Sequence, residues 1–322
     1  MTSPRLSAAM FTCLLAAAAA AWSLELHGTA AQDPPRPTFR SGASAVAVDV
    51  TVRARSRPVT GLTAADFQVF DNGVLQQVDT VSYGKLPIDV TIALDVSHSV
   101  TGDLLDRLRR GVVQLMRDLG REDRLKLMLF NQSVNRTTDF TTDVTLVEGA
   151  IRSVAAAGGT ALLDAISVSL VSASSPDRRQ LIVFFTDGSD SSSITTPEVL
   201  TGVAQRSRAT LTFVAPAAFR NMTLVSGAGT GVPITTRVMS ARPGSFPPLL
   251  SALARETGGS VLPVGGSIDL SAAFRRVLDE FRSAYVLYYT PRGVEPGGYH
   301  AIEVKTTRDG AEVRARRGYF GS

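Results

Sequence analysis

Cysteine and histidine are nearly absent from this chain of 322 residues. The one cysteine is Cys13, which excludes a framework of disulfide bonds and any zinc site built on cysteine. The three histidines, His27, His98 and His300, are too few and too scattered for a histidine-rich metal cluster. A metal site in this chain would therefore have to rely on oxygen-bearing side chains.

Lysine is also scarce, since only three of the 33 basic residues are lysines. The arginines are interspersed with acidic residues, so the formal net charge of +4 is not gathered in one patch. We interpret this bias as solvated surface and predict no nucleic-acid partner. Hydrophobic residues make up 44% of the chain and charged residues 19%, which predicts a globular protein and excludes disorder throughout.

Long hydrophobic runs are absent except for Leu6–Trp22 near the N-terminus. Arg5 precedes this run, and Thr29-Ala30-Ala31 follows it as a small-residue cleavage site, with Ala19-Ala20-Ala21 as the alternative site. Residues 1–31 therefore have the pattern of a secretory signal peptide. The pattern predicts a secreted or periplasmic protein with no membrane span in the mature chain. An uncleaved N-terminal membrane anchor is the alternative.

Two β-rich segments, residues 41–87 and 284–322, flank the middle of the chain after a proline-rich linker at 32–40. In the first segment Asp71-Asn72-Gly73 separates expected strands at 66–70 and 74–82, because Asn-Gly accepts the positive φ of a tight hairpin turn. Strands are expected at 285–289, 299–306 and 312–316 in the second segment. We predict that the two segments pack together as a β-sandwich-like module; two separate appendages are the alternative.

Residues 88–283 alternate between strand and helix patterns. The apolar runs Ile88–Leu94 and Gln180–Phe185 are typical of strands covered by helices on both faces. Other strands are expected at 124–130, 137–141, 210–215 and 260–264, and helices at 103–119, 146–156, 161–172, 197–206, 248–257 and 267–281. The alternation predicts an α/β domain with a doubly wound, mostly parallel, Rossmann-like sheet. The long connection Pro216–Pro247 is either a rim that selects partners or an idle insertion.

Oxygen-bearing side chains follow the expected strands of this domain. Asp95, Ser97 and Ser99 come directly after the first apolar strand, Thr160 follows a Gly-Gly pair before a helix, and Asp187 follows the second apolar strand. Parallel strands end at the same edge of a sheet, so these side chains are expected to converge there. Two carboxylates and three hydroxyls suit Mg²⁺, with Mn²⁺ or Ca²⁺ possible.

These residues, in this order, resemble the metal-ion-dependent adhesion site of the von Willebrand factor type A domain. The resemblance covers roughly residues 86–283, and all five positions match. Segments Gly61–Phe67 and Arg314–Tyr319 are similar to the flanks of a secreted bacterial subfamily. The resemblance implies that Ser97 and Ser99 bind the metal directly, and Thr160 directly or through water. Asp95 and Asp187 would act through water or as acceptors that orient the ligands.

The resemblance also implies a function: a protein-binding module whose metal, with few direct carboxylate ligands, captures an Asp or Glu carboxylate of a partner protein. One alternative is a metal-dependent phosphoester hydrolase, although Ser97 stands where a second aspartate would be wanted and no phosphate-binding loop or nucleophile elbow is present. The other alternative is a structural or assembly subunit whose metal only stabilises the fold.

Each part of the motif also has a plain structural interpretation. The serines and aspartates after a strand can cap the next helix, and Gly-Gly-Thr and Thr-Asp-Gly can be simple turns. We interpret His98 as a surface residue at the rim of the site, and Asp164 and Asp190 as helix-start and loop residues rather than ligands.

Overall fold

The computed structural model describes residues 45–84, 86–98, 100, 102–152, 154–172, 175, 177–216, 247–264 and 269–321. The predicted signal peptide at 1–31, the linker at 32–40, Ser99 and most of the connection Pro216–Pro247 lie outside these residues. Among the residues that are described, no helix combines the length and the apolar character needed to cross a bilayer.

The α/β domain is built on a sheet with the strand order β11-β10-β9-β6-β7-β8. The strands pair in parallel except β8, which runs antiparallel to β7 at the edge. In sequence order they are β6 (Ile88–Asp95), β7 (Arg124–Phe130), β8 (Val134–Thr137), β9 (Arg179–Phe185), β10 (Thr210–Pro216) and β11 (Val261–Val264). Strand β6 lies between β7 and β9, so both of its edges are paired.

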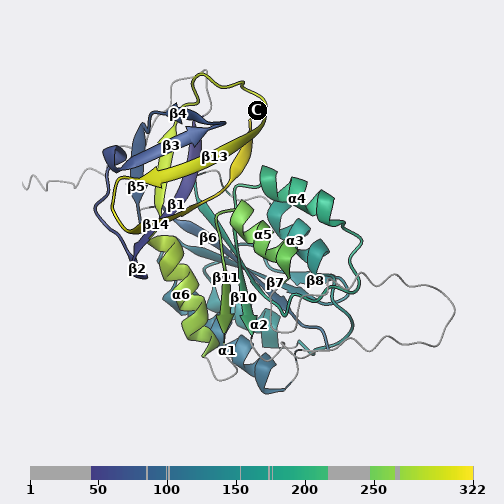
Figure 1. Cartoon of the computed structure of the whole chain (residues 1–322). Helices are drawn as coiled ribbons and strands as arrows, with labels where there is room; N and C mark the ends of the chain where they lie inside the picture. Colours follow the sequence, from purple (N-terminus) through teal and green to yellow (C-terminus); the bar gives the residue numbers. More distant parts are fainter. Residues whose placement is uncertain are drawn as a thin grey trace, which may run out of the picture. The chain divides into compact units, whose positions relative to one another are not determined.

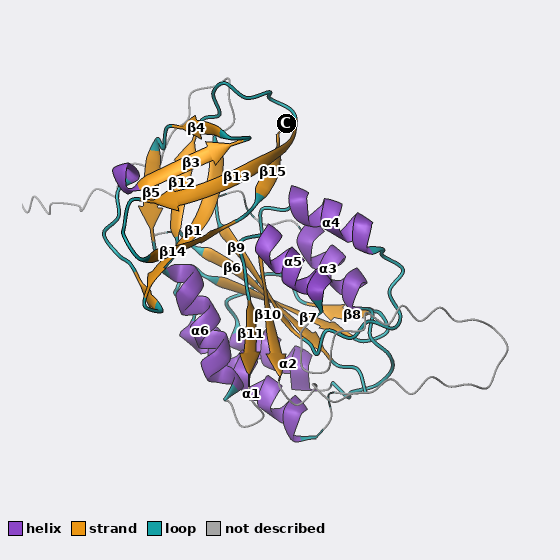
Figure 2. Ribbon diagram, viewed as in Figure 1, coloured by secondary structure: helices purple, strands orange, loops and turns teal. Residues whose placement is uncertain are grey.

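Six helices cover the two faces of this sheet in the described part of the domain (Figure 2). They are α1 (Asp103–Asp118), α2 (Val144–Arg152), α3 (Leu162–Val171), α4 (Pro197–Arg206), α5 (Pro248–Glu256) and α6 (Leu270–Arg282). One hydrophobic cluster joins α1, α2 and α6 to one face, and another joins α3, α4 and α5 to the other face. Strand β6 is buried along its whole length because side chains on both of its faces enter these clusters.

The flanking β module contains two further sheets (Figure 1). One has the order β14-β1-β12-β5, with β2 beside β1, and the other has the order β15-β13-β3-β4. The strands from the N-terminal side are β1 (Val46–Ala54), β2 (Arg57–Pro58), β3 (Phe67–Asp71), β4 (Val74–Gln76) and β5 (Thr80–Tyr83). Those from the C-terminal side are β12 (Tyr285–Tyr289), β13 (Gly298–Thr306), β14 (Ala311–Ala315) and β15 (Gly318–Gly321).

The core of the β module draws on both ends of the chain. Val48 and Val50 of β1 pack in one buried cluster with Tyr285 and Leu287 of β12, and Val69 of β3 joins the same cluster. Strand β1 pairs with β12 and β14, and β3 pairs with β13. The predicted fold, an α/β domain with a flanking β-sandwich-like module made from both terminal segments, is confirmed. The domain boundaries stay a prediction.

The expected second strand of the hairpin, at 74–82, is wrong as a single element. The chain leaves β3 after β4 and enters the other sheet as β5. The side chain of Gln76 fixes this departure, because its amide nitrogen donates to Arg292 O at 3.0 Å and its oxygen accepts from Arg292 N at 2.8 Å. A side chain that binds a backbone 216 residues away is invisible to a local pattern.

Other expected boundaries also moved. The strand expected at 137–141 is β8, which ends at Thr137, because a turn at Asn131–Ser133 brings the chain back onto β7 early. Helix α2 ends at Arg152 rather than at 156. Helix α6 begins after Asp269 rather than at 267, and the carboxylate of Asp269 caps it by accepting from Ser271 N at 2.9 Å. Strand β15 was not predicted.

Candidate functional site

Asp95 is the last residue of β6 and lies at the carboxyl edge of the α/β sheet. Its side chain is buried and accepts from the backbone nitrogen of Ser97 at 2.9 Å and from the hydroxyl of Thr186 at 3.3 Å. Thr186 directly follows β9, the neighbouring strand. The first hydrogen bond bends the chain just after β6, and the second joins the loop after β6 to the loop after β9.

Burial and a neighbouring carboxylate both raise the pKa of Asp95. Burial raises the pKa of Asp95 to about 6, hydrogen bonds from Ser97 and Thr186 oppose this shift, and the negative charge of Asp187 adds to it. The two carboxylates stand at the ends of neighbouring parallel strands, at the same edge of the sheet. Two carboxylates held near each other at a buried edge favour a cation between or beside them.

The loop that carries Thr160 lies on the loop after β6. His98 N donates to Gly158 O at 3.2 Å, and Ala157 N donates to Val96 O at 2.9 Å. Gly158 has φ of +78°, and a Cβ on it would lie 2.6 Å from the side-chain oxygen of Gln132. The positive φ favours glycine at this position, and any larger residue would also require the Gln132 side chain to move.

The loop after β9 also contacts the loop that carries Thr160. Asp187 is half-buried, and its carboxylate accepts from Ser189 N at 2.7 Å. The backbone nitrogens of Ser191 and Ser192 donate to Thr160 O at 2.8 and 3.0 Å. Loops that carry Asp95 with Ser97, Thr160, and Asp187 are therefore joined in pairs by hydrogen bonds at one edge of the sheet.

Four of the five predicted site residues lie in the described part of the chain, and the fifth, Ser99, does not. Ser97 and Thr160 are 3% and 6% exposed, so their hydroxyls are buried polar groups next to the two carboxylates' loops. The described residues contain no group of three or more His, Cys, Asp or Glu side chains able to hold a metal. Any metal here must therefore use hydroxyl ligands, and the oxygen-only donor set fits a hard divalent ion. The assignment of the site residues remains a prediction.

Sequence reasoning missed several residues that shape this edge. Thr186 was treated only as part of a Thr-Asp-Gly pattern, yet its hydroxyl bonds to Asp95 and accepts from Gly188 N at 3.1 Å. Asn131 is not among the predicted site residues, although its backbone oxygen accepts from Ala161 N at 2.5 Å and its amide donates to Ala157 O. The serine-rich run after Asp187 is a sequence signal for further polar contacts at this edge.

Residues 90–189 match the family model of the von Willebrand factor type A domain. The chain contains a von Willebrand factor type A domain. The match includes the predicted site positions of β6, the Gly-Gly-Thr loop and the loop after β9. Among curated proteins, none matches this chain.

Several solved structures are similar to this chain in fold. A von Willebrand factor type A protein from Catenulispora acidiphila is 13% identical with a TM-score of 0.47, covering 88% of this chain and 75% of that one. BatB, a conserved hypothetical protein from Bacteroides thetaiotaomicron, is 18% identical with a TM-score of 0.44, covering 60% and 98%. Proximal thread matrix protein 1 from the mussel byssus, with a zinc-occupied MIDAS motif, is 12% identical with a TM-score of 0.43, covering 64% and 48%.

Proposed function

We propose that this type A domain protein is a metal-dependent protein-binding module. Asp95, Ser97, Ser99, Thr160 and Asp187 would hold Mg²⁺, with Mn²⁺ or Ca²⁺ as alternatives. The observation that carries the proposal is the set of hydrogen bonds that joins the three loops bearing these residues at the carboxyl edge of the sheet. The family match supports the coarser statement, a protein-interaction module of the type A kind.

The chemistry of the donor set supports a partner that offers a carboxylate. Two side-chain carboxylates are available, and the remaining ligands are neutral hydroxyls, so the chain itself supplies little charge in direct contact with a divalent ion. A metal bound there would supply an open position with affinity for an outside oxyanion. An Asp or Glu side chain of a partner protein has the right charge and ligand atom. Secretion to the periplasm or beyond, which would place the module near such partners, remains part of the proposal.

The metal is tested first. We expect isothermal titration to show saturable binding of Mg²⁺ or Mn²⁺ to the purified protein. The Asp187→Ala variant should bind about 10–100-fold more weakly, the usual cost of losing a group that binds or orients ligands. Asp309→Ala is the matched control, because Asp309 is exposed in the turn between β13 and β14 and should leave the affinity unchanged. No saturable binding by the unmodified protein would rule out the metal site.

The partner is tested next. Immobilised protein should capture an envelope protein in Mg²⁺ and release it in EDTA, while its thermal midpoint changes little. A large fall in the midpoint in EDTA with unchanged capture would instead favour the structural subunit, whose metal only stabilises the fold. Turnover of generic phosphoester substrates that is lost in Asp95→Ala would favour the hydrolase. Capture that persists in EDTA contradicts the proposal as stated.

A further inference from the structure

The segment that follows Asp187 lies against the start of α3. We call residues 189–195 the serine segment; four of its members are serines. It begins two residues after one predicted metal ligand, Asp187, and it contacts the loop that carries another, Thr160. Several hydrogen bonds join the serine segment to the Thr160 loop and the start of α3.

Thr160 is held by the serine segment through both of its backbone groups. Thr160 N donates to the hydroxyl of Ser191 at 2.9 Å. Thr160 O accepts from Ser191 N at 2.8 Å and from Ser192 N at 3.0 Å. Gly159 makes this possible, because a Cβ there would lie 2.7 and 2.8 Å from the hydroxyl oxygens of Ser192 and Ser191.

The same segment also caps α3, which begins two residues after Thr160. Ala161 occupies the N-cap position and has no side chain that could cap the helix. Asp190 takes this role from the other loop, since its Oδ1 accepts from Leu162 N at 2.8 Å and from Leu163 N at 3.3 Å. A carboxylate at this end of a helix is also stabilised by the helix dipole.

A second set of hydrogen bonds closes the contact. The hydroxyl of Ser193 donates to Asp190 at 2.6 Å and accepts from Asp164 N at 3.1 Å. The carboxylate of Asp164 in turn accepts from Ile194 N at 3.1 Å and from Thr195 N at 2.8 Å. Donors and acceptors therefore run in both directions, so one loop cannot slide along the other without breaking several hydrogen bonds at once.

We propose that Asp190 and Ser191 are positioning residues of the candidate metal site, which lock Thr160 to the Asp187 loop in the metal-free protein. This inference rests on the proposed function, because these residues can position ligands only if the site binds a metal. Thr160 and Asp187 then form one preformed unit, and the metal does not have to bring them together. The cost of ordering these ligands is met during folding, which strengthens metal binding.

Ser191→Ala tests the hold on Thr160. Hydrogen exchange of the metal-free variant should show the Thr160 amide exchanging about tenfold faster, since its acceptor is lost. The affinity for Mn²⁺ should fall about tenfold while the thermal midpoint stays near that of the wild type. Ser191→Thr keeps the hydroxyl and should restore both values. Ser189→Ala is the control, since that serine is exposed and its hydroxyl bonds to none of the described residues.

Asp190 separates positioning from charge. Asp190→Asn keeps an oxygen that can accept from Leu162 N but removes the negative charge, and asparagine is also a good helix cap. We expect Asn to keep the Mn²⁺ affinity within about twofold and Ala to lose about tenfold. If Asn weakens binding as much as Ala does, charge rather than position is responsible and the inference fails.

The outcomes distinguish the two proposals. If the wild type binds Mn²⁺ and Ser191→Ala changes neither the exchange of Thr160 nor the affinity, the positioning role is wrong and the metal-binding function stands. If exchange accelerates but affinity is unchanged, the contact is structural only and the inference is likewise overturned. If the wild type binds no metal, the proposed function fails and this inference fails with it.

Discussion

Asp71 gathers three polar side chains inside the β module. Its carboxylate accepts from the hydroxyls of Tyr289 and Tyr319, both at 2.9 Å, and lies 2.8 Å from Nδ1 of His300. Asp71 and His300 are 0% and 1% exposed. A buried carboxylate is tolerated only when its oxygens are satisfied, so these residues depend on one another.

Tyr289→Phe tests this dependence through its response to pH. Burial, with further contributions from Tyr319 and Asp71, raises the pKa of the Tyr289 phenol well above its usual value of 10.0. Above pH 10 the unfolded chain releases this proton while the folded chain keeps it, so the stabilising effect of the hydroxyl decreases as pH rises. The free energy of unfolding of the wild type should be larger than that of the variant by about 2 kcal/mol at pH 8, and by less at pH 11.

Urea denaturation of both proteins between pH 8 and pH 11 measures this difference. Titrations of residues that do not contact Tyr289 affect both proteins alike, so the difference between their unfolding free energies is the informative quantity. A difference that stays constant, or that grows with pH, would contradict the assignment of the buried hydroxyl to Asp71.

The local role of these residues could be predicted from the sequence, whereas their contacts with distant residues could not. Asp71-Asn72-Gly73 predicted a hairpin turn, and Asn72 and Gly73 indeed have φ of 47° and 81°. No pattern could show that Asp71 also meets residues 218, 229 and 248 positions away. Likewise, the motif marks Asp95 and Asp187 directly, whereas Thr186 and Ser191 act through contacts that only the folded chain creates.

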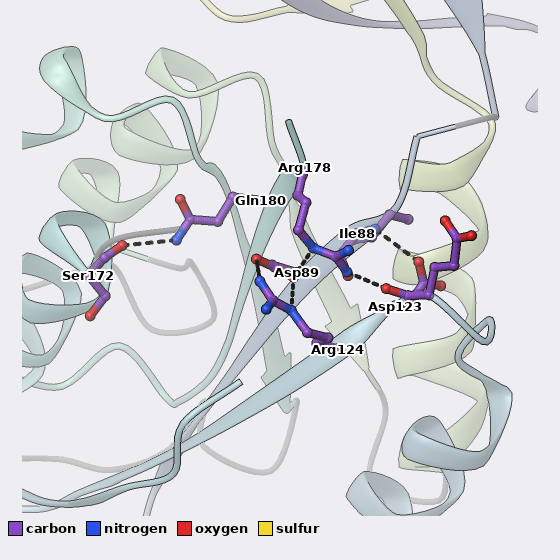
Figure 3. A network of polar contacts seen from close by, with 8 residues as sticks. Ile88, Asp89, Asp123, Arg124, Ser172, Arg178 and Gln180 are labelled. Carbon is purple, nitrogen blue, oxygen red and sulfur yellow. Dashed lines mark hydrogen bonds and ion pairs between the residues drawn. The ribbon is translucent and has the colours of Figure 1, made fainter. Parts of the chain in front are cut away.

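At the scale of elements, a polar network ties the amino-terminal ends of three neighbouring strands (Figure 3). Asp89 of β6 accepts from Arg124 of β7 at 2.9 and 2.7 Å, and from Arg178, just before β9, at 2.6 Å. Nearby, Asp123 accepts from Ile88 N at 2.9 Å. Asp89 is fully buried in an otherwise apolar strand, so its charge depends on the two arginines.

Asp89→Ala should destabilise the α/β domain by about 3 kcal/mol, because it leaves two partly buried guanidinium groups without their carboxylate. Thermal and urea denaturation would measure the loss. Asp106→Ala is the matched control, since Asp106 forms a comparable pair with Arg109 at 2.8 Å but on an exposed helix surface. Such a pair is worth at most about 1 kcal/mol. Equal losses in the two variants would mean that burial does not decide the strength of these contacts.

Periodicity in the sequence predicted which segments are strands and which are helices. It did not predict where these elements begin and end. The apolar run Ile88–Leu94 was enough to place β6, because a strand covered on both faces needs little else. Asp89 within that run gave no hint of its partners, which lie 35 and 89 residues away. The split of the segment after Asn72-Gly73 into β4 and β5 depends on which sheet each half joins, and that choice is made by tertiary contacts.

At the scale of the whole molecule, ion pairs join the β module to the α/β domain. Asp49 of β1 pairs with Arg179 of β9 at 2.6 Å, and Arg179 also stacks on Phe281 of α6. Glu280 of α6 pairs with Arg53 of β1 at 3.3 Å and with Arg314 of β14. The sequence predicted the two parts because one alternates strand and helix patterns and the other has strand patterns alone. The ion pairs between the two parts have no periodic pattern in the sequence and could not be predicted.

These contacts predict that the two parts unfold together. Calorimetry of the wild type should show one transition with equal calorimetric and van't Hoff enthalpies. Glu280→Ala removes the partner of two arginines from two different strands, so it should lower the thermal midpoint of this transition, while the Asp49–Arg179 pair keeps the two parts coupled. Glu303→Ala breaks only an exposed pair with Lys305, at 3.1 Å within β13, and should keep the single transition. Two transitions in the wild type would show that the β module folds independently, and the ion pairs to α6 and β9 would then be incidental to its stability.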